Sequence, residues 1–334
     1  MRKILTLFLT LSFLTGISTS ISGSGLDNAD SRYPSRQYRR FLLPNQMKVM
    51  LISDPTLQHG AASLTVAVGS MSDPVKRFGL AHFLEHMLFL GTVKYPEEGS
   101  YQKFVSTHDG FSNAYTADDR TNYHFEIDPE YLEEGLDRFS QFFLAPLFNP
   151  NLVEREKRAV ESEHSKNIPN DFRRIYQVKR KAYEEGHPAR HFGTGNMETL
   201  EGVTRVELLG FYREHYSSNQ MMLAVAGPQD LDTLQNLVAP RFAAVKNRNL
   251  LEKRISSKFM KPDPRLRLMQ VKTIKDSRTL TLMFPLSSTL HYYKSQPLGM
   301  LGFLLGHEGR GSLLSLLKRE NLATALSAGG GISN

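Results

Sequence analysis

Apolar residues follow two patterns along this chain, and each pattern predicts one kind of element. Short apolar segments with β-branched or aromatic residues between turn residues indicate strands; they cover residues 47–52, 61–68, 121–127 and 221–226. Longer segments with apolar and charged residues at helical spacing indicate helices; they cover residues 129–143, 151–166, 171–185, 204–215 and 231–245. Strands and helices mixed in this way predict an α+β fold, in which helices pack on a mixed, largely antiparallel sheet.

One further predicted helix is apolar on all sides. Residues 77–90 carry few charges, and Gly91 follows them as a residue that commonly ends helices. A helix of this composition is expected to lie in the protein interior. Its few polar residues are costly to bury, so each of them needs a partner.

Composition divides the chain into further units. Residues 246–266 are rich in basic residues, hold a Pro-Asp-Pro sequence and show little periodicity, which is typical of a linker. We therefore expect a first domain over residues 37–248, a linker over 249–266 and a second domain from 267 to 334. The second domain has predicted strands at 278–284 and 322–328 and predicted helices at 296–305 and 312–318. Its pattern is unfinished at residue 334, so we expect a truncated domain.

The N-terminal residues have the composition of a secretory signal peptide. Arg2 and Lys3 precede an apolar segment over residues 4–14, and small polar residues follow it. A membrane anchor is the alternative, but the apolar segment is shorter than the roughly 20 residues that span a bilayer. The sequence therefore predicts a signal peptide over residues 1–24, export to the periplasm or the medium, and no stable membrane insertion.

The absence of cysteine and the modest net charge exclude several classes of function. Without cysteine the chain forms no disulfides and offers no thiolate ligands, so any metal site uses histidine and carboxylate side chains. The formal net charge is +7, but the basic clusters at residues 173–174, 179–181 and 253–254 lack interleaved aromatic residues. A solvated surface is the better interpretation, and no nucleic-acid partner is expected.

The apolar helix contains the residues with the most specific chemistry. His82 and His86 are four residues apart, so both imidazoles project from one helix face, and Glu85 lies beside them. The spacing H-x-x-E-H is the inverse of the H-E-x-x-H pattern of zinc peptidases. A pair of hydrogen-bonded core histidines is the alternative interpretation. Because two imidazoles and a carboxylate are costly to bury without partners, the pentad favours a metal site.

A catalytic zinc site usually takes three protein ligands, so a third side chain is needed. The charged helix over residues 151–166 offers two pairs of carboxylates at a spacing of seven residues. Glu156 and Glu163 share one helix face, whereas Glu154 and Glu161 share another. Spacing alone does not choose between these pairs, and a charged helix face without any ligand is the third interpretation.

Four segments of the sequence resemble the pitrilysin and insulin-degrading enzyme family, in the order in which that family has them. The segments are HFLEHMLFLGTVKYPEEGSYQKFVSTHDGFSNAYTADDRTNYHFEI at 82–127, REKRAVESEHSKN at 155–167, FGTGNMETLEGVT at 192–204 and LGHEGRGSLLSLLK at 305–318. The resemblance implies that His82, His86 and Glu163 bind one zinc ion (Zn2+) per chain. It also implies that Glu85 is the general base.

The same resemblance implies roles for three more residues. Glu156 matches an acidic residue that assists the site, either by orienting a ligand histidine or by balancing the charge of the metal. Asn113 and Ala114 match a segment that binds the substrate backbone along an edge strand. Zinc lowers the pKa of a bound water and Glu85 accepts its proton, so the expected function is that of an exported zinc endopeptidase that hydrolyses peptides and small polypeptides.

Members of this family are implied to be much longer, with similar domains that form two halves around the substrate. We therefore expect this chain to need a missing C-terminal half or a separate partner chain, and to show weak or no activity alone. The alternative is a catalytically inactive, truncated family member that acts as a binding or assembly module. Retention of His82, Glu85, His86 and Glu163 favours the enzyme.

Overall fold

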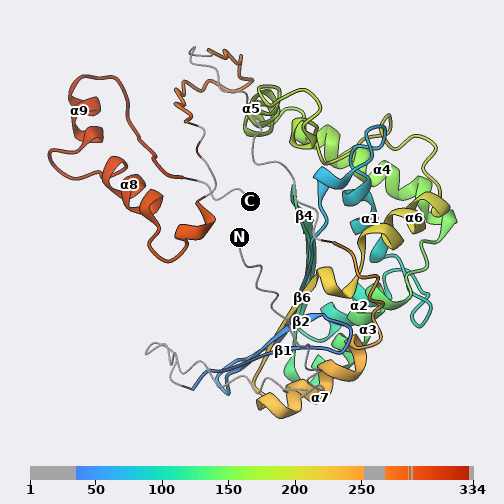
Figure 1. Ribbon diagram of the computed structural model, residues 1–334. Coiled ribbons are helices and arrows are strands. Elements are labelled where there is room, and N and C mark those ends of the chain that lie inside the picture. The colour runs from blue at the N-terminus through green and yellow to red at the C-terminus, as the bar shows by residue number, and fades with distance from the viewer. Residues whose placement is uncertain (1–34, 252–267, 285, 287–288, 331–334) are drawn as a thin grey trace, which may run out of the picture.

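A single twisted sheet lies at the centre of the computed structural model, which describes residues 35–251, 268–284, 286 and 289–330 (Figure 1). Within these residues, six strands pair in the order β1-β2-β6-β3-β5-β4. All neighbours are antiparallel except β2 and β6, which are parallel. The strands are β1 (Gln37–Leu42), β2 (Lys48–Ser53), β3 (Gly60–Val66), β4 (Phe111–Thr116), β5 (Thr121–Ile127) and β6 (Met221–Gly227). The predicted mixed, largely antiparallel sheet is confirmed.

Helices cover one face of this sheet (Figure 1). Residues of β3 alternate between buried and half-buried, as expected when one face of an antiparallel sheet packs on helices and the other face is more open. Leu51, Leu64 and Leu223 of three neighbouring strands have no accessible surface. The helices on this face are α1 (Leu80–Leu88), α2 (Ser100–Thr107), α3 (Leu132–Leu144), α4 (Pro150–Asn167), α6 (Arg205–His215) and α7 (Leu231–Phe242).

Aromatic side chains join the sheet to α3 and to the end of α1. Phe139 packs edge-to-face on Phe125 of β5, with ring centroids 5.2 Å apart. Phe142 packs in the same manner on Phe89 at 5.2 Å and on Tyr101 at 4.8 Å. Edge-to-face contacts are favoured by the charge distribution of aromatic rings. Because Phe89 directly follows α1, this cluster fixes the end of the helix that carries the predicted pentad.

The helix α5 (Asp171–Arg180) lies near the β4 end of the sheet and ends earlier than the predicted residue 185 (Figure 1). After α5 the chain forms a loop, because the Arg190 guanidinium donates hydrogen bonds to the carbonyls of Lys181 and Tyr183. These contacts replace the further helical turn that the composition of residues 181–185 indicated.

Two predicted strands are wrong. Residues 278–284 and 322–328 have strand-like composition, but neither segment forms a strand in the structure. Backbone groups of a strand need a paired neighbour, and no strand of the described residues pairs with either segment. The predicted helices of this region are present as α8 (Pro297–Leu305) and α9 (Leu313–Arg319). Residues 1–24 of the predicted signal peptide and most of the predicted linker lie outside the described residues.

Candidate metal centre

The start of α1 is held by a carboxylate cap. The side chain of Asp73 accepts hydrogen bonds from the backbone N–H groups of Gly79, at 2.6 Å, and Ala81, at 2.8 Å. These bonds satisfy N–H groups that the first turn of a helix leaves unpaired. Most residues of α1 are buried. The pentad at residues 82–86 therefore stands on a helix that is fixed at its start and along its length.

The side chains of His82, His86 and Glu163 meet between α1 and α4. The two Nε2 atoms are 3.2 Å apart, and Glu163 Oε2 lies 3.5 Å from His82 Nε2 and 3.8 Å from His86 Nε2. In the part of the chain that the structure describes, these residues form the only group of three that could hold a metal ion. Two zinc–nitrogen bonds at a tetrahedral angle place their nitrogens about 3.3 Å apart. The spacing of the two imidazoles therefore fits zinc.

Each imidazole is oriented by a hydrogen bond behind its ring. His82 Nδ1 lies 2.7 Å from the carbonyl oxygen of Thr194, and His86 Nδ1 lies 2.7 Å from Glu156 Oε1. Carbonyl and carboxylate oxygens accept hydrogen bonds, so each Nδ1 carries the proton and donates. When both rings are neutral, as metal binding requires, both Nε2 atoms present lone pairs toward each other and toward Glu163. Three acceptor atoms that face one another repel, and a cation between them converts the repulsion into attraction.

The two histidines have different pKa values in the metal-free protein. Burial, together with the positive charge of a protonated His86, lowers the pKa of His82. Burial acts in the same direction on His86, but the hydrogen bond and the negative charge of Glu156 outweigh it and raise the pKa of His86. A metal ligand must be neutral and basic. His82 is held neutral, and Glu156 increases the basicity of His86.

Glu85 lies next to the histidines and contacts the end of β4. Its carboxylate accepts a hydrogen bond from the hydroxyl group of Thr116. The residue is 6% exposed, and burial raises the pKa of its carboxyl group to about 7, although the bond from Thr116 acts in the opposite direction. A carboxyl group of this kind is suited to accept a proton and return it near neutral pH.

These side chains line a cavity of 1190 Å³ that also includes residues of β4 and α5. Asn113 and Ala114 of β4 line it, as does Arg173 of α5. Because β4 is the last strand in the sheet order, its outer backbone groups have no strand beside them among the described residues. The volume exceeds the 300–1,000 Å³ that is typical of small-molecule pockets, so the cavity has room for a peptide segment.

The two other carboxylates of α4, Glu154 and Glu161, are not part of the group formed by His82, His86 and Glu163. Glu154 forms an ion pair with Lys157, at 2.7 Å, and Glu161 accepts a hydrogen bond from the backbone N–H of Met197, also at 2.7 Å. The crossing of α4 over α1 thus brings Glu156 and Glu163 to the histidines, a choice that spacing left open. The carbonyl of Thr194 was not predicted. The sequence feature that could have indicated this carbonyl is the segment FGTGN, whose glycines allow another backbone to approach closely.

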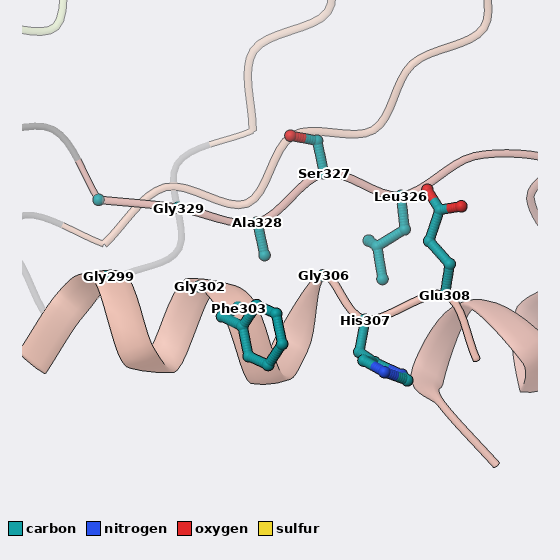
Figure 2. Close-up of a pocket in the computed structure, with 11 residues that line it drawn as sticks. Gly299, Gly302, Phe303, Gly306, His307, Glu308, Leu326, Ser327, Ala328 and Gly329 are labelled. Atoms are coloured by element: carbon teal, nitrogen blue, oxygen red, sulfur yellow. The ribbon is translucent and has the colours of Figure 1, made fainter. Parts of the chain in front are cut away.

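A second cavity, of 560 Å³, lies between α8 and residues 326–330 (Figure 2). Gly302 of α8 allows the close packing here, since a Cβ at that position would lie 3.0 Å from the Cα of Gly329. Figure 2 shows His307 and Glu308 on opposite sides of the chain. The Nδ1 atom of His307 accepts a hydrogen bond from Gly309 N at 3.0 Å, which makes the ring part of a local turn.

Comparisons with known proteins agree on one family. A profile described as "Insulinase (Peptidase family M16)" matches residues 48–186, and one described as "Peptidase M16 inactive domain" matches residues 202–334. The chain is 45% identical to insulin-degrading enzyme-like 1, peroxisomal, of Arabidopsis thaliana, over 92% of this chain and 32% of that protein. It is 46% identical to the insulin-degrading enzyme of Homo sapiens, over 88% of this chain and 30% of that protein.

The fold agrees with the same assignment. A crystal structure of pitrilysin is similar to this chain with a TM-score of 0.74 and 28% sequence identity, over 93% of this chain and 33% of that chain. The chain therefore spans about a third of the length of the relatives that it matches.

The relatives correct the prediction of export to the periplasm or the medium. The Arabidopsis relative is peroxisomal by its name, and the human relative is named only as an insulin-degrading enzyme. The prediction rested on two basic residues and a short apolar segment, a pattern of composition with little specificity. Because these relatives do not support export, the prediction of export is wrong. In the part of the chain that the structure describes, no helix is long and apolar enough to cross a bilayer.

Proposed function

The chain belongs to the M16 family of peptidases, and on that premise we propose that residues 37–248 form the zinc-binding catalytic domain of a metalloendopeptidase. The proposal assigns His82, His86 and Glu163 as ligands of one zinc ion and Glu85 as the general base. The substrates that fit the cavity are extended peptides and small polypeptides. The activity belongs to a longer protein, because the chain spans about a third of the relatives that it matches.

One observation carries the proposal: three acceptor atoms face one another between α1 and α4. The Nδ1–H groups of both histidines are already donated to Thr194 and Glu156, which leaves both Nε2 lone pairs directed at the same point as Glu163. Two imidazoles and one carboxylate with a fourth position open to a cavity are the donor set of a catalytic zinc site.

When bound, zinc would supply Lewis-acid polarisation of the scissile carbonyl and would make nearby water more acidic. Glu85 then accepts the proton of the attacking water and returns it to the leaving amine. The hydroxyl group of Thr116 holds the Glu85 carboxylate by a hydrogen bond. Glu156 and Thr194 keep the two ligand rings in place through their Nδ1–H groups.

The open edge of β4 is the surface on which the substrate backbone would pair. The N–H of Ala114 donates to its neighbour's side chain, Asn113 Oδ1, at 2.9 Å, so it is not used in the ladder with β5. In an antiparallel pair, the N–H and C=O of one residue point to the same side, so both groups of Ala114 face away from β5, and a substrate carbonyl would replace Asn113 Oδ1 as the acceptor of the N–H. Main-chain bonding of this kind supports cleavage with little sequence preference.

Metal analysis tests the assigned ligand set. We expect one zinc per folded chain after dialysis against zinc, and a value near zero for His82→Ala and for Glu163→Ala, because two remaining ligands hold zinc weakly. The matched control is His59→Ala, since His59 is a half-buried histidine that pairs with Asp109 outside the centre. Unchanged zinc content in both ligand variants would contradict the assignment.

A binding or assembly module without catalysis is the alternative function. Such a module needs neither a general base nor an open zinc position. In this chain, however, Glu85 lies beside the proposed ligands, and all four side chains line a cavity. The enzyme is therefore the better-supported proposal.

A further inference from the structure

The ring of His82 is oriented by the backbone of a loop, residues 193–199, which is remote from α1 in sequence. The acceptor of its Nδ1–H group is the main-chain carbonyl of Thr194, at 2.7 Å. This carbonyl is part of the main chain and moves only with the loop. The orientation of the His82 ring therefore depends on the position of the whole loop.

Two glycines bring this loop against α1. Gly79 has a φ of 91°, and Gly195 has a φ of 80°, a region that residues with a side chain rarely adopt. A Cβ at Gly79 would lie 2.2 Å from the Cα of Gly195. The two backbones are therefore in direct contact, and this contact places the neighbouring Thr194 carbonyl within reach of His82.

The other side of the loop is attached to α4. Asn196 and Thr199 close the loop through two hydrogen bonds, Asn196 N to Thr199 Oγ1 at 3.1 Å and Thr199 N to Asn196 Oδ1 at 2.9 Å. Inside this closed turn, the backbone N–H of Met197 donates to Glu161 Oε2 at 2.7 Å. A hydrogen bond to a charged acceptor is stronger than one between neutral groups.

We propose that Glu161 is a positioning residue of the metal centre, which holds the loop 193–199 so that the Thr194 carbonyl orients His82. The inference rests on the proposed function, in which His82 is a zinc ligand. It makes α4 the common support of the site: Glu163 is a ligand, Glu156 orients one histidine directly, and Glu161 orients the other through the loop.

Zinc affinity in Glu161 variants tests the inference. We expect Glu161→Ala to raise the dissociation constant for zinc about tenfold, the lower end of what loss of a partner behind a ligand costs. Glu161→Gln keeps an oxygen that accepts the Met197 N–H in a weaker, neutral hydrogen bond, so its affinity is expected to lie closer to that of the parent than to that of Glu161→Ala. Competition with a chromophoric chelator gives the constants, and thermal unfolding of the metal-free variants gives their stability. Ser162→Ala, on the same helix, is the matched control.

Three outcomes would overturn the inference while leaving the zinc site intact. Glu161→Ala could bind zinc as tightly as the parent, or Glu161→Gln could bind zinc as weakly as Glu161→Ala. The third outcome is that the loss of zinc affinity is matched by an equal loss in the stability of the metal-free variant. Equal weakening would mean that the charge alone acts. Absence of zinc binding in the parent chain would instead remove the proposed function itself.

Discussion

At the scale of single residues, the metal centre depends on hydrogen bonds that lie behind its ligands. Glu156 and the Thr194 carbonyl hold the Nδ1–H groups of the two histidines. A ring held from behind presents its Nε2 lone pair with less loss of rotamer freedom when a metal binds. Changes behind the ligands should therefore alter metal affinity, whereas changes at the general base should alter turnover.

Replacement of Glu85 by Gln should separate these two effects. The amide keeps the size of the side chain and can accept the Thr116 bond, but it cannot accept a proton from water. We expect one zinc per chain and a fall in kcat of at least about a hundredfold, which is the usual contribution of a general base. The substitution belongs in a chimera in which this chain replaces the matching part of the human relative, assayed with a fluorogenic peptide and by metal analysis.

The control for this variant is Glu130→Gln, which removes an exposed carboxylate that lies outside the cavity. Its turnover should equal that of the parent chimera. Glu85 would not be the base if Glu85→Gln kept more than about a tenth of the parental kcat.

The H-x-x-E-H spacing was enough to predict that His82, Glu85 and His86 share one helix face. The third ligand was different, because Glu156 and Glu163 have the same spacing as Glu154 and Glu161. Spacing does not distinguish the pairs, and the choice of Glu163 came from the family resemblance; physically it is the crossing of α4 over α1 that separates them, and a crossing is set by packing between residues far apart in sequence. The Thr194 carbonyl is a backbone group, so no side chain in the sequence marks it as a partner of His82.

At the scale of elements, the strands at the two ends of the sheet order were the least predictable. β1 contains Arg39 and Arg40, and β4 has an exposed or half-buried residue at every position. Edge strands commonly carry polar residues because one side of their backbone has no partner. The inner strands β3, β5 and β6 are largely buried, and their apolar patterns predicted them well.

The open edge of β4 leads to a prediction about substrate affinity. Ala114→Pro removes the N–H that faces away from β5, and proline is tolerated on an edge strand when its position points away from the ladder. A lost main-chain hydrogen bond of about 1.4 kcal/mol corresponds to a tenfold change. We expect KM for a fluorogenic peptide to rise about tenfold in the chimera, with zinc content unchanged.

Ala114→Gly is the matched variant, because it also changes the side chain but keeps the N–H. It should retain a KM close to that of the parent. Equal KM values for Ala114→Pro and the parent would show that substrates do not pair with this residue of β4.

At the scale of the whole molecule, the described chain has one well-packed unit and one exposed region. The sheet and its helices bury a continuous apolar core. By contrast, Leu280, Phe284 and Phe303 are 82%, 77% and 67% exposed. Side chains this exposed have little packing contact with the rest of the described residues. The strands predicted at 278–284 and 322–328 failed for a related reason, since a strand forms only when a neighbour pairs with it. The domain bounds at 248 and 266 stay a prediction.

The last prediction concerns the activity of these 334 residues alone. We expect them to bind zinc and to hydrolyse a fluorogenic peptide at least about a hundredfold more slowly than the chimera, because removal of even one group that stabilises the developing oxyanion costs that much. The cavity is lined by the proposed ligands, Glu85, β4 and α5, and we expect a group opposite the metal to come from the remaining length that the relatives have. The Glu85→Gln chimera gives the background rate, and light scattering verifies that the isolated chain is monodisperse. Equal rates for the monodisperse chain and the chimera would show that this third of the protein completes the site by itself.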